Sequence, residues 1–112
     1  MNQIQYHRQG MTKDWLLSNG FRYSKLLSTD DAPVYTYRFP VYKYKNMIVL
    51  ECEISVILGE DNIKLNVYDY NTNDKYAAFY YCEYGNCNKM LKIVWNKITD
   101  VLQKLGIERC DE

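Results

Sequence analysis

The stretch that decides the fold is residues 34–67, which read VYTYRFPVYKYKNMIVLECEISVILGEDNIKLNV. It holds three segments rich in β-branched and aromatic residues, at 34–45, 47–58 and 63–69. Residues of these types are enriched in strands. A very short turn joins the first two segments, and the turn-forming residues GEDN at 59–62 separate the second from the third. The pattern predicts an antiparallel meander.

The middle segment alternates between two kinds of side chain, which is typical of a strand with one face in the core. The face expected in the core carries Ile48, Leu50, Cys52, Ile54 and Val56. Pairing with the third segment extends that face by Ile63, Leu65 and Val67. Lys64, Asn66 and Tyr68 then face the other way, because side chains alternate along a strand. In the first segment, Pro40 removes a ladder donor and predicts a bulge or an edge-facing position.

Both ends of the chain predict helices that cover the dry face of this sheet. Thr12 is a candidate N-cap for a short helix that carries Trp15 and Leu16 and stops before Gly20. So short a helix is unstable alone, so both side chains are expected to pack on the sheet. Near the other end, apolar residues recur at helical spacing: Met90, Leu91, Val94, Ile98, Val101, Leu102 and Leu105. Gly106 is typical of a helix end.

The order of elements predicts an α+β fold. We expect a two-layer sandwich, in which an antiparallel sheet of about four strands is flanked by a short N-terminal and a long C-terminal helix. Residues 21–27 alternate and predict an additional edge strand. Residues 1–10 are polar and aperiodic, which predicts a flexible N-terminal arm, and residues 11–112 are expected to form a single domain.

Composition excludes several classes of function. Lys plus Arg and Asp plus Glu each number 14, so the net charge is zero. This disfavours simple nucleic-acid binding, which needs a basic excess. The four cysteines lack the spacing of a zinc site, and His7 is the single histidine, so neither a metal nor a cofactor is expected. Residues 1–10 lack the apolar core of a signal peptide, which favours a cytoplasmic protein.

Catalytic residues are not predicted. Glu51 and Glu53 share the outer face, and a carboxylate pair can support acid–base chemistry or hold a cation. On a solvated sheet face, such a pair is more often polar coverage balanced by lysines such as Lys43 and Lys64. Cys82 and Cys87 flank the start of the last helix, but the single histidine, His7, lies in the expected N-terminal arm, so no base is expected beside them. We therefore expect a protein that is not an enzyme.

Twelve tyrosines are the compositional anomaly. Tyrosine is enriched in strands and also in protein-binding surfaces. The predicted partner-binding surface combines the outer sheet face with the segment at 70–84, and it comprises Tyr35, Tyr37, Glu51, Glu53, Lys64, Tyr68, Tyr76 and Tyr80. The alternative is a nucleic-acid-binding protein that uses the basic face of the last helix, with Lys89, Lys92 and Lys97.

Three stretches carry a resemblance: Tyr37-Arg-Phe-Pro-Val-Tyr-Lys-Tyr44, Leu50-Glu-Cys-Glu-Ile-Ser-Val56, and Asn66-Val-Tyr-Asp-Tyr70 through Glu83-Tyr-Gly-Asn86. In these the chain resembles small accessory proteins of phages, plasmids and conjugative elements of Firmicutes. Several such proteins are anti-CRISPR proteins that bind Cas9. The resemblance implies a stoichiometric inhibitor that blocks guide RNA loading or DNA binding. It assigns no residue roles.

Overall fold

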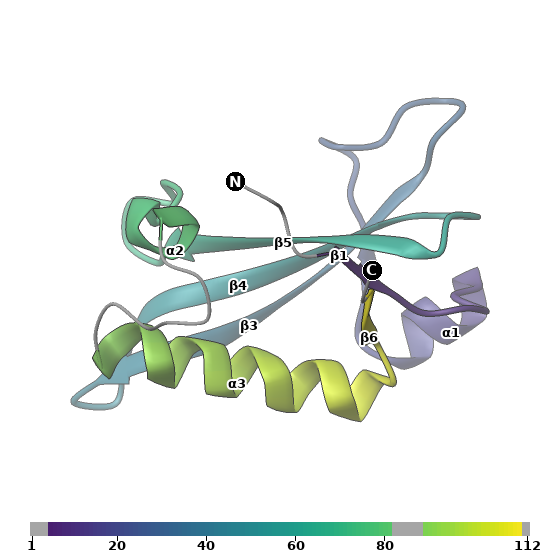
Figure 1. The fold of residues 1–112 in the computed structure, drawn as a ribbon. Coiled ribbons are helices and arrows are strands. Elements are labelled where there is room, and N and C mark those ends of the chain that lie inside the picture. Colours follow the sequence, from purple (N-terminus) through teal and green to yellow (C-terminus); the bar gives the residue numbers. More distant parts are fainter. Residues whose placement is uncertain (1–4, 82–88, 111–112) are drawn as a thin grey trace.

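The computed structural model describes residues 5–81 and 89–110 (Figure 1). It is an α+β protein with an antiparallel sheet in the order β2-β3-β4-β5-β1-β6. The elements are β1 (Gln5–His7), α1 (Lys13–Ser18), β2 (Arg22–Tyr23), β3 (Val34–Tyr44), β4 (Met47–Ile57), β5 (Asn62–Asp69), α2 (Ala77–Tyr81), α3 (Lys89–Leu105) and β6 (Glu108–Cys110). The described part of the sheet thus has six strands instead of the expected four or so, because short strands near both chain ends join it.

The predicted meander forms β3, β4 and β5, and a tight turn sets its register. Lys45 and Asn46 connect β3 to β4, and both have positive φ, at 51° and 65°. Two such residues give the type I′ turn, whose twist matches that of a β-hairpin. Tyr44 then pairs with Met47, and Arg38 pairs with Glu53. The register shifts just after Pro40, which confirms the expected bulge.

One face of these strands forms the core. Cys52, Ile54 and Val56 of β4 are fully buried, and they pair with Val67, Leu65 and Ile63 of β5 as the sequence predicts. Figure 1 shows α3 running along this side of the sheet. The helix buries its predicted stripe at Leu91, Val94, Ile98 and Leu102. We call this side the inner face and the opposite side the outer face.

The end of α3 has the predicted glycine stop. Gly106 has a φ of 70°, a left-handed conformation that glycine adopts without steric cost. The N–H of Ile107 donates to the carbonyl of Leu102 at 2.9 Å, and that of Gly106 donates to Gln103 at 3.1 Å. These two bonds form the Schellman motif. Of the helices in the described ranges, none is long and apolar enough to cross a membrane.

The first residues that the structure describes do not form the expected arm. Gln5–His7 is β1, which lies between β5 and β6 and pairs with both. Tyr6 is 8% exposed, and it pairs with Ile63 on one side and with Arg109 on the other. The sequence gives little sign of this strand, because three residues are too few to show a period of two.

The N-terminal helix packs as predicted. The Thr12 side chain accepts a hydrogen bond from the N–H of Trp15 at 3.2 Å, which confirms the N-cap. Leu16 is fully buried, and the Trp15 ring lies 6.0 Å from the Phe21 ring. Gly20 follows with a φ of 91°, and a Cβ there would lie 3.1 Å from the Tyr37 ring. A glycine is therefore needed where the chain leaves α1 for β2 and passes close to Tyr37 of β3.

Candidate protein-binding surface

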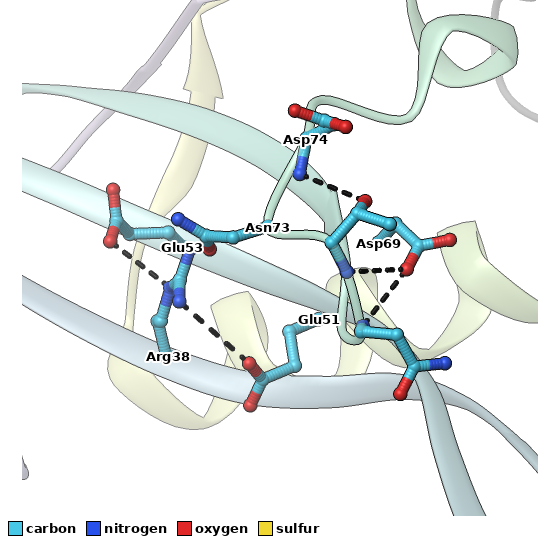
Figure 2. Close-up of polar contacts among 8 residues, drawn as sticks. Arg38, Glu51, Glu53, Asp69, Asn73 and Asp74 are labelled. Atoms are coloured by element: carbon cyan, nitrogen blue, oxygen red, sulfur yellow. Dashed lines mark hydrogen bonds and ion pairs between the residues drawn. The ribbon is translucent and has the colours of Figure 1, made fainter.

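The outer face centres on Arg38, which projects from the middle of β3 (Figure 2). Its Nε lies 3.2 Å from Glu53 Oε2, and its Nη1 lies 3.9 Å from Glu51 Oε1. Its Nη2 donates to Asn73 Oδ1 at 2.8 Å, and its Cζ lies 4.6 Å from the centroid of the Tyr68 ring. We call these five residues the Arg38 cluster. One guanidinium therefore joins three strands and the turn that follows β5.

The register of the hairpin explains this geometry. Counting back from the Tyr44–Met47 pair places Arg38 directly opposite Glu53. Glu53 in turn pairs with Asn66, and Glu51 pairs with Tyr68. Opposite charges that face each other across strands stabilise a sheet. The cation that balances the two glutamates is therefore Arg38, rather than Lys43 or Lys64 as the sequence suggests.

The turn at residues 69–74, which follows β5, brings Asn73 to the cluster. The Asp69 carboxylate accepts hydrogen bonds from the backbone N–H groups of Asn71 and Thr72, at 2.9 and 3.1 Å. Asn73 has a positive φ of 62°, a conformation that asparagine tolerates better than most residues. The backbone N–H of Asp69 then donates to the carbonyl of Asp74 at 2.8 Å, which closes the turn. Hydrogen bonds within the turn thus fix its conformation. The bond from Arg38 to Asn73 then joins the turn to the sheet.

Two predicted site residues, Tyr76 and Tyr80, form hydrogen bonds with the edge of β5 at Asn66 and Val67. The N–H of Tyr76 donates to the carbonyl of Val67 at 2.8 Å. The Tyr80 hydroxyl accepts from the N–H of Val67 at 3.2 Å and donates to Asn66 Oδ1 at 3.0 Å. These bonds occupy backbone groups that an edge strand otherwise offers to other chains. Both tyrosines are half-buried, so here they serve the fold as well as the surface.

The pKa values of Tyr68, which belongs to the cluster, and of Tyr80 are raised above the ordinary tyrosine value. Burial raises the pKa of Tyr68, and the negative charge of Glu53 raises it further, while Arg38 opposes the shift. Burial also raises the pKa of Tyr80, and its hydrogen bond with Val67 opposes that shift. A raised pKa favours the neutral phenol, which is the form in which the Tyr80 hydroxyl can donate to Asn66 Oδ1.

The prediction that Tyr35 and Tyr37 lie on the outer face is wrong. Tyr35 pairs with Val56 and Tyr37 pairs with Ile54, so both point to the inner face. Tyr35 is 5% exposed, and Tyr37 packs its ring 5.5 Å from that of Phe21. The register set by the two-residue turn decides which face each β3 side chain occupies. It pairs the odd-numbered residues at this end of β3 with the buried residues of β4.

The remaining predicted residues keep their expected exposure. Lys64 is exposed on the outer face, where it pairs with Ser55. Lys89, Lys92 and Lys97 are all exposed on α3. Cys82, Cys87 and the part of the 70–84 segment beyond Tyr81 lie outside the described residues. In the ranges that are described, no group of three or more His, Cys, Asp or Glu residues is placed to hold a metal ion.

Two exposed leucines in the turn after β2 were not predicted from the sequence. Residues 21–27 were expected to form a strand, but β2 ends at Tyr23 and the chain turns. Leu26 is 93% exposed and Leu27 is 48% exposed in this turn. The alternation of apolar and polar residues over 21–27 predicts a strand and does not indicate this turn. The serines at positions 24 and 28 do indicate it, because serine side chains bond to nearby backbone groups.

Comparisons with family models, with curated protein sequences and with solved structures found no match to this chain.

Proposed function

We propose that this protein is a non-enzymatic inhibitor that binds another protein through the outer face of its sheet. The partner that we propose is Cas9, as the resemblance to accessory proteins of mobile elements implies, and the step blocked is guide RNA loading or DNA binding. The proposal places its action in the bacterial cytoplasm. The observation that supports binding is the Arg38 cluster, an ordered surface of mixed charge on the outer face of the sheet, where the Arg38 side chain is 36% exposed.

Order in the free protein favours affinity. A side chain that is already fixed loses less entropy when a partner covers it. Arg38 is fixed by Glu53, Asn73 and Tyr68, yet 36% of its side chain remains exposed. Arginine and tyrosine are also among the residues most enriched in the energetically dominant parts of protein interfaces. The surface therefore suits a protein partner better than a phosphate backbone, because its carboxylates repel anions.

The test is a titration of guide-free Cas9 into the full-length protein. We expect a stoichiometric complex that survives nuclease treatment. Lys64→Glu should weaken it by about tenfold, because a reversed charge next to the cluster disturbs charge complementarity. Lys104→Glu on α3 is the matched control, because Lys104 is also exposed and carries the same charge but lies on the helix that covers the inner face. Equal affinity of the two variants, or no complex at all, would contradict the proposal.

A second candidate function is nucleic-acid binding by α3. Lys89, Lys92 and Lys97 are exposed, and within residues 5–81 and 89–110 no carboxylate lies within ion-pair distance of them. Free lysines on a helix can contact phosphates. If this candidate is correct, RNA or DNA should bind with an affinity that falls steeply with salt, and replacing each lysine by glutamine should reduce that slope by about one. Binding that is insensitive to salt would exclude it.

A further inference from the structure

Charge is distributed unevenly along this chain, although the net charge is zero. Residues 39–50 and 89–99 together hold five lysines and neither aspartate nor glutamate. The first of these stretches is the end of β3, the turn after it and the start of β4, and the second is the first part of α3. A local excess of one sign creates a local electrostatic potential even in a protein whose net charge is zero.

The fold brings the two stretches to the same end of the sheet. The two residues after α3 lead into β6, which pairs with β1, and β1 pairs with Asn62 and Ile63 at the start of β5. The last turn of α3 therefore lies near the β4–β5 turn. The 17 residues of α3 span about 25 Å, and the helix contacts β3. The first turn of α3 thus lies at the other end of the sheet, where Figure 1 shows the β3–β4 turn.

Lys43 lies on the side of the sheet that α3 covers. Its cross-strand partner is Ile48, which is two residues before the buried Leu50 and therefore on the same face of β4. Lys45 follows in the β3–β4 turn. We call the four exposed lysines of the hairpin and of the first turn of α3 the basic end: Lys43, Lys45, Lys89 and Lys92.

The basic end carries an excess of positive charge. In the part of the chain that the structure describes, no carboxylate lies within ion-pair distance of these four lysines. Asp69 and Asp74 also lie at this end, since Asp69 pairs with Leu50 of β4. The Asp69 carboxylate, however, already accepts hydrogen bonds from two backbone N–H groups of its own turn. Glu83 lies outside the described residues.

Charge complementarity selects an anionic chain as the ligand. Lysines on two separate elements suit phosphates that repeat along a strand, because each cation can contact its own phosphate. The Tyr44 ring is 60% exposed with Lys45 Nζ 5.5 Å from its centroid, and unpaired bases stack on exposed aromatic rings. A lipid surface needs apolar side chains on one face. Here Met47 is exposed on the outer face of the sheet, whereas Ile93 is exposed on α3, which covers the inner face.

We propose that the basic end binds the phosphate backbone of a single-stranded nucleic acid, with the β3–β4 hairpin and the first turn of α3 as the two halves of the contact surface. This proposal rests on the second candidate function and adds the hairpin to it. It is independent of Cas9 binding, which the titration described above decides. It also leaves the Arg38 cluster free for a protein partner.

The test measures binding of the full-length protein to a labelled single-stranded RNA of about 20 nucleotides, longer than the stretch that one small domain covers. Fluorescence anisotropy is recorded at increasing salt. Lys43→Gln with Lys45→Gln, and separately Lys89→Gln with Lys92→Gln, should each weaken binding about tenfold at low salt. Each lysine removed should also lower the slope of log affinity against log salt by about 0.7.

Lys13→Gln with Lys25→Gln is the matched control, because it removes the same charge from two exposed lysines at the other end of the sheet. Lys13 lines a hollow together with residues 58–61 of the β4–β5 turn. Lys25 follows β2, which pairs with the first part of β3. We expect the control variant to bind the RNA as tightly as the original protein. Thermal unfolding of each variant verifies that the fold is intact.

The other outcomes separate this proposal from the function on which it rests. If the α3 pair weakens binding and the hairpin pair does not, the proposal is refuted and the second candidate function stands. If the RNA does not bind even at low salt, both are refuted. An equal loss in all three variants would show a diffuse charge effect and refute the basic end. Tighter binding to a duplex of the same sequence, or binding only to vesicles of anionic lipid, would refute the single-stranded ligand.

Discussion

The two faces of β3, β4 and β5 share one backbone and one register, yet different interactions hold them. On the inner face, Cys52 and Ile54 are fully buried and need only apolar neighbours. On the outer face, the side chains of Glu51 and Glu53 are 17% and 14% exposed, and both pair with Arg38. Burial is not directional, whereas ion pairs and hydrogen bonds depend on geometry.

Because of this difference, the inner face determines most of the stability of the fold, and the outer face determines the chemistry of the surface. Close packing makes the loss of even a few atoms from the inner face costly. Partly exposed ion pairs contribute little free energy, because water and salt screen them. The outer face can therefore change its chemistry at small cost to the fold, which is the property that a binding surface needs. The following predictions test this comparison.

Removal of residues 1–10 should have the largest effect on stability. It deletes β1, so β5 loses a partner at Ile63 and β6 loses its partner strand. It also removes the buried Tyr6 ring. We expect the free energy of unfolding to fall by at least about 4 kcal/mol in urea titrations, because a large side chain and several ladder bonds are lost together. An unchanged unfolding midpoint would restore the interpretation of residues 1–10 as a flexible arm.

Substitution on the inner face should cost much more than substitution at the adjacent outer position. Ile54→Ala leaves a cavity at a fully buried site, and the expected loss is about 2–5 kcal/mol. Ser55→Ala is the control, because Ser55 is the next residue of β4 and faces outward; we expect a change within about 0.5 kcal/mol. Urea unfolding of both variants measures the difference. Similar losses at the two positions would contradict the distinction between the faces.

The Arg38 cluster should contribute about 1 kcal/mol, discounted for the exposure of Arg38. A double-mutant cycle with Arg38→Met and Glu53→Gln isolates the pair. We expect a coupling free energy of about 0.5–1 kcal/mol at low salt. It should shrink at about 1 M salt, where charges are screened over about 3 Å. A coupling that is zero at low salt would mean that the pair does not order the outer face.

Stability should fall at alkaline pH through Tyr68 and Tyr80, and this effect is the smallest. Both have a folded pKa above the ordinary value of about 10, so the folded state binds the phenol protons more tightly than the unfolded state. Their contribution is fully present below about pH 10 and is lost as the pH rises through the folded pKa values. Replacing both by phenylalanine should flatten this decline in urea titrations at increasing pH. An equally steep decline in the double variant would assign it to other groups.

Sequence reasoning located most of the fold because its signals are local. The alternation of β4, the stripe of α3 and the stop at Gly106 each lie within one element, and each is confirmed. The candidate site was predicted in part. Glu51, Glu53, Lys64 and Tyr68 lie on the outer face as expected, whereas Tyr35 and Tyr37 do not. The alternation of side chains around Tyr35 and Tyr37 was visible in the sequence. Only the register of the hairpin decides which of the two faces of β3 is buried.

The sequence by itself determined β3, β4 and β5, the turns between them and the apolar stripe of the long helix, because period and turn chemistry act over a few residues. Only the tertiary structure decided that Gln5–His7 enters the sheet between β5 and β6, since its bonds come from residues far along the chain. It also decided that Arg38 meets Asn73, 35 positions away. Contacts of this kind depend on how the elements pack, and no local pattern encodes them.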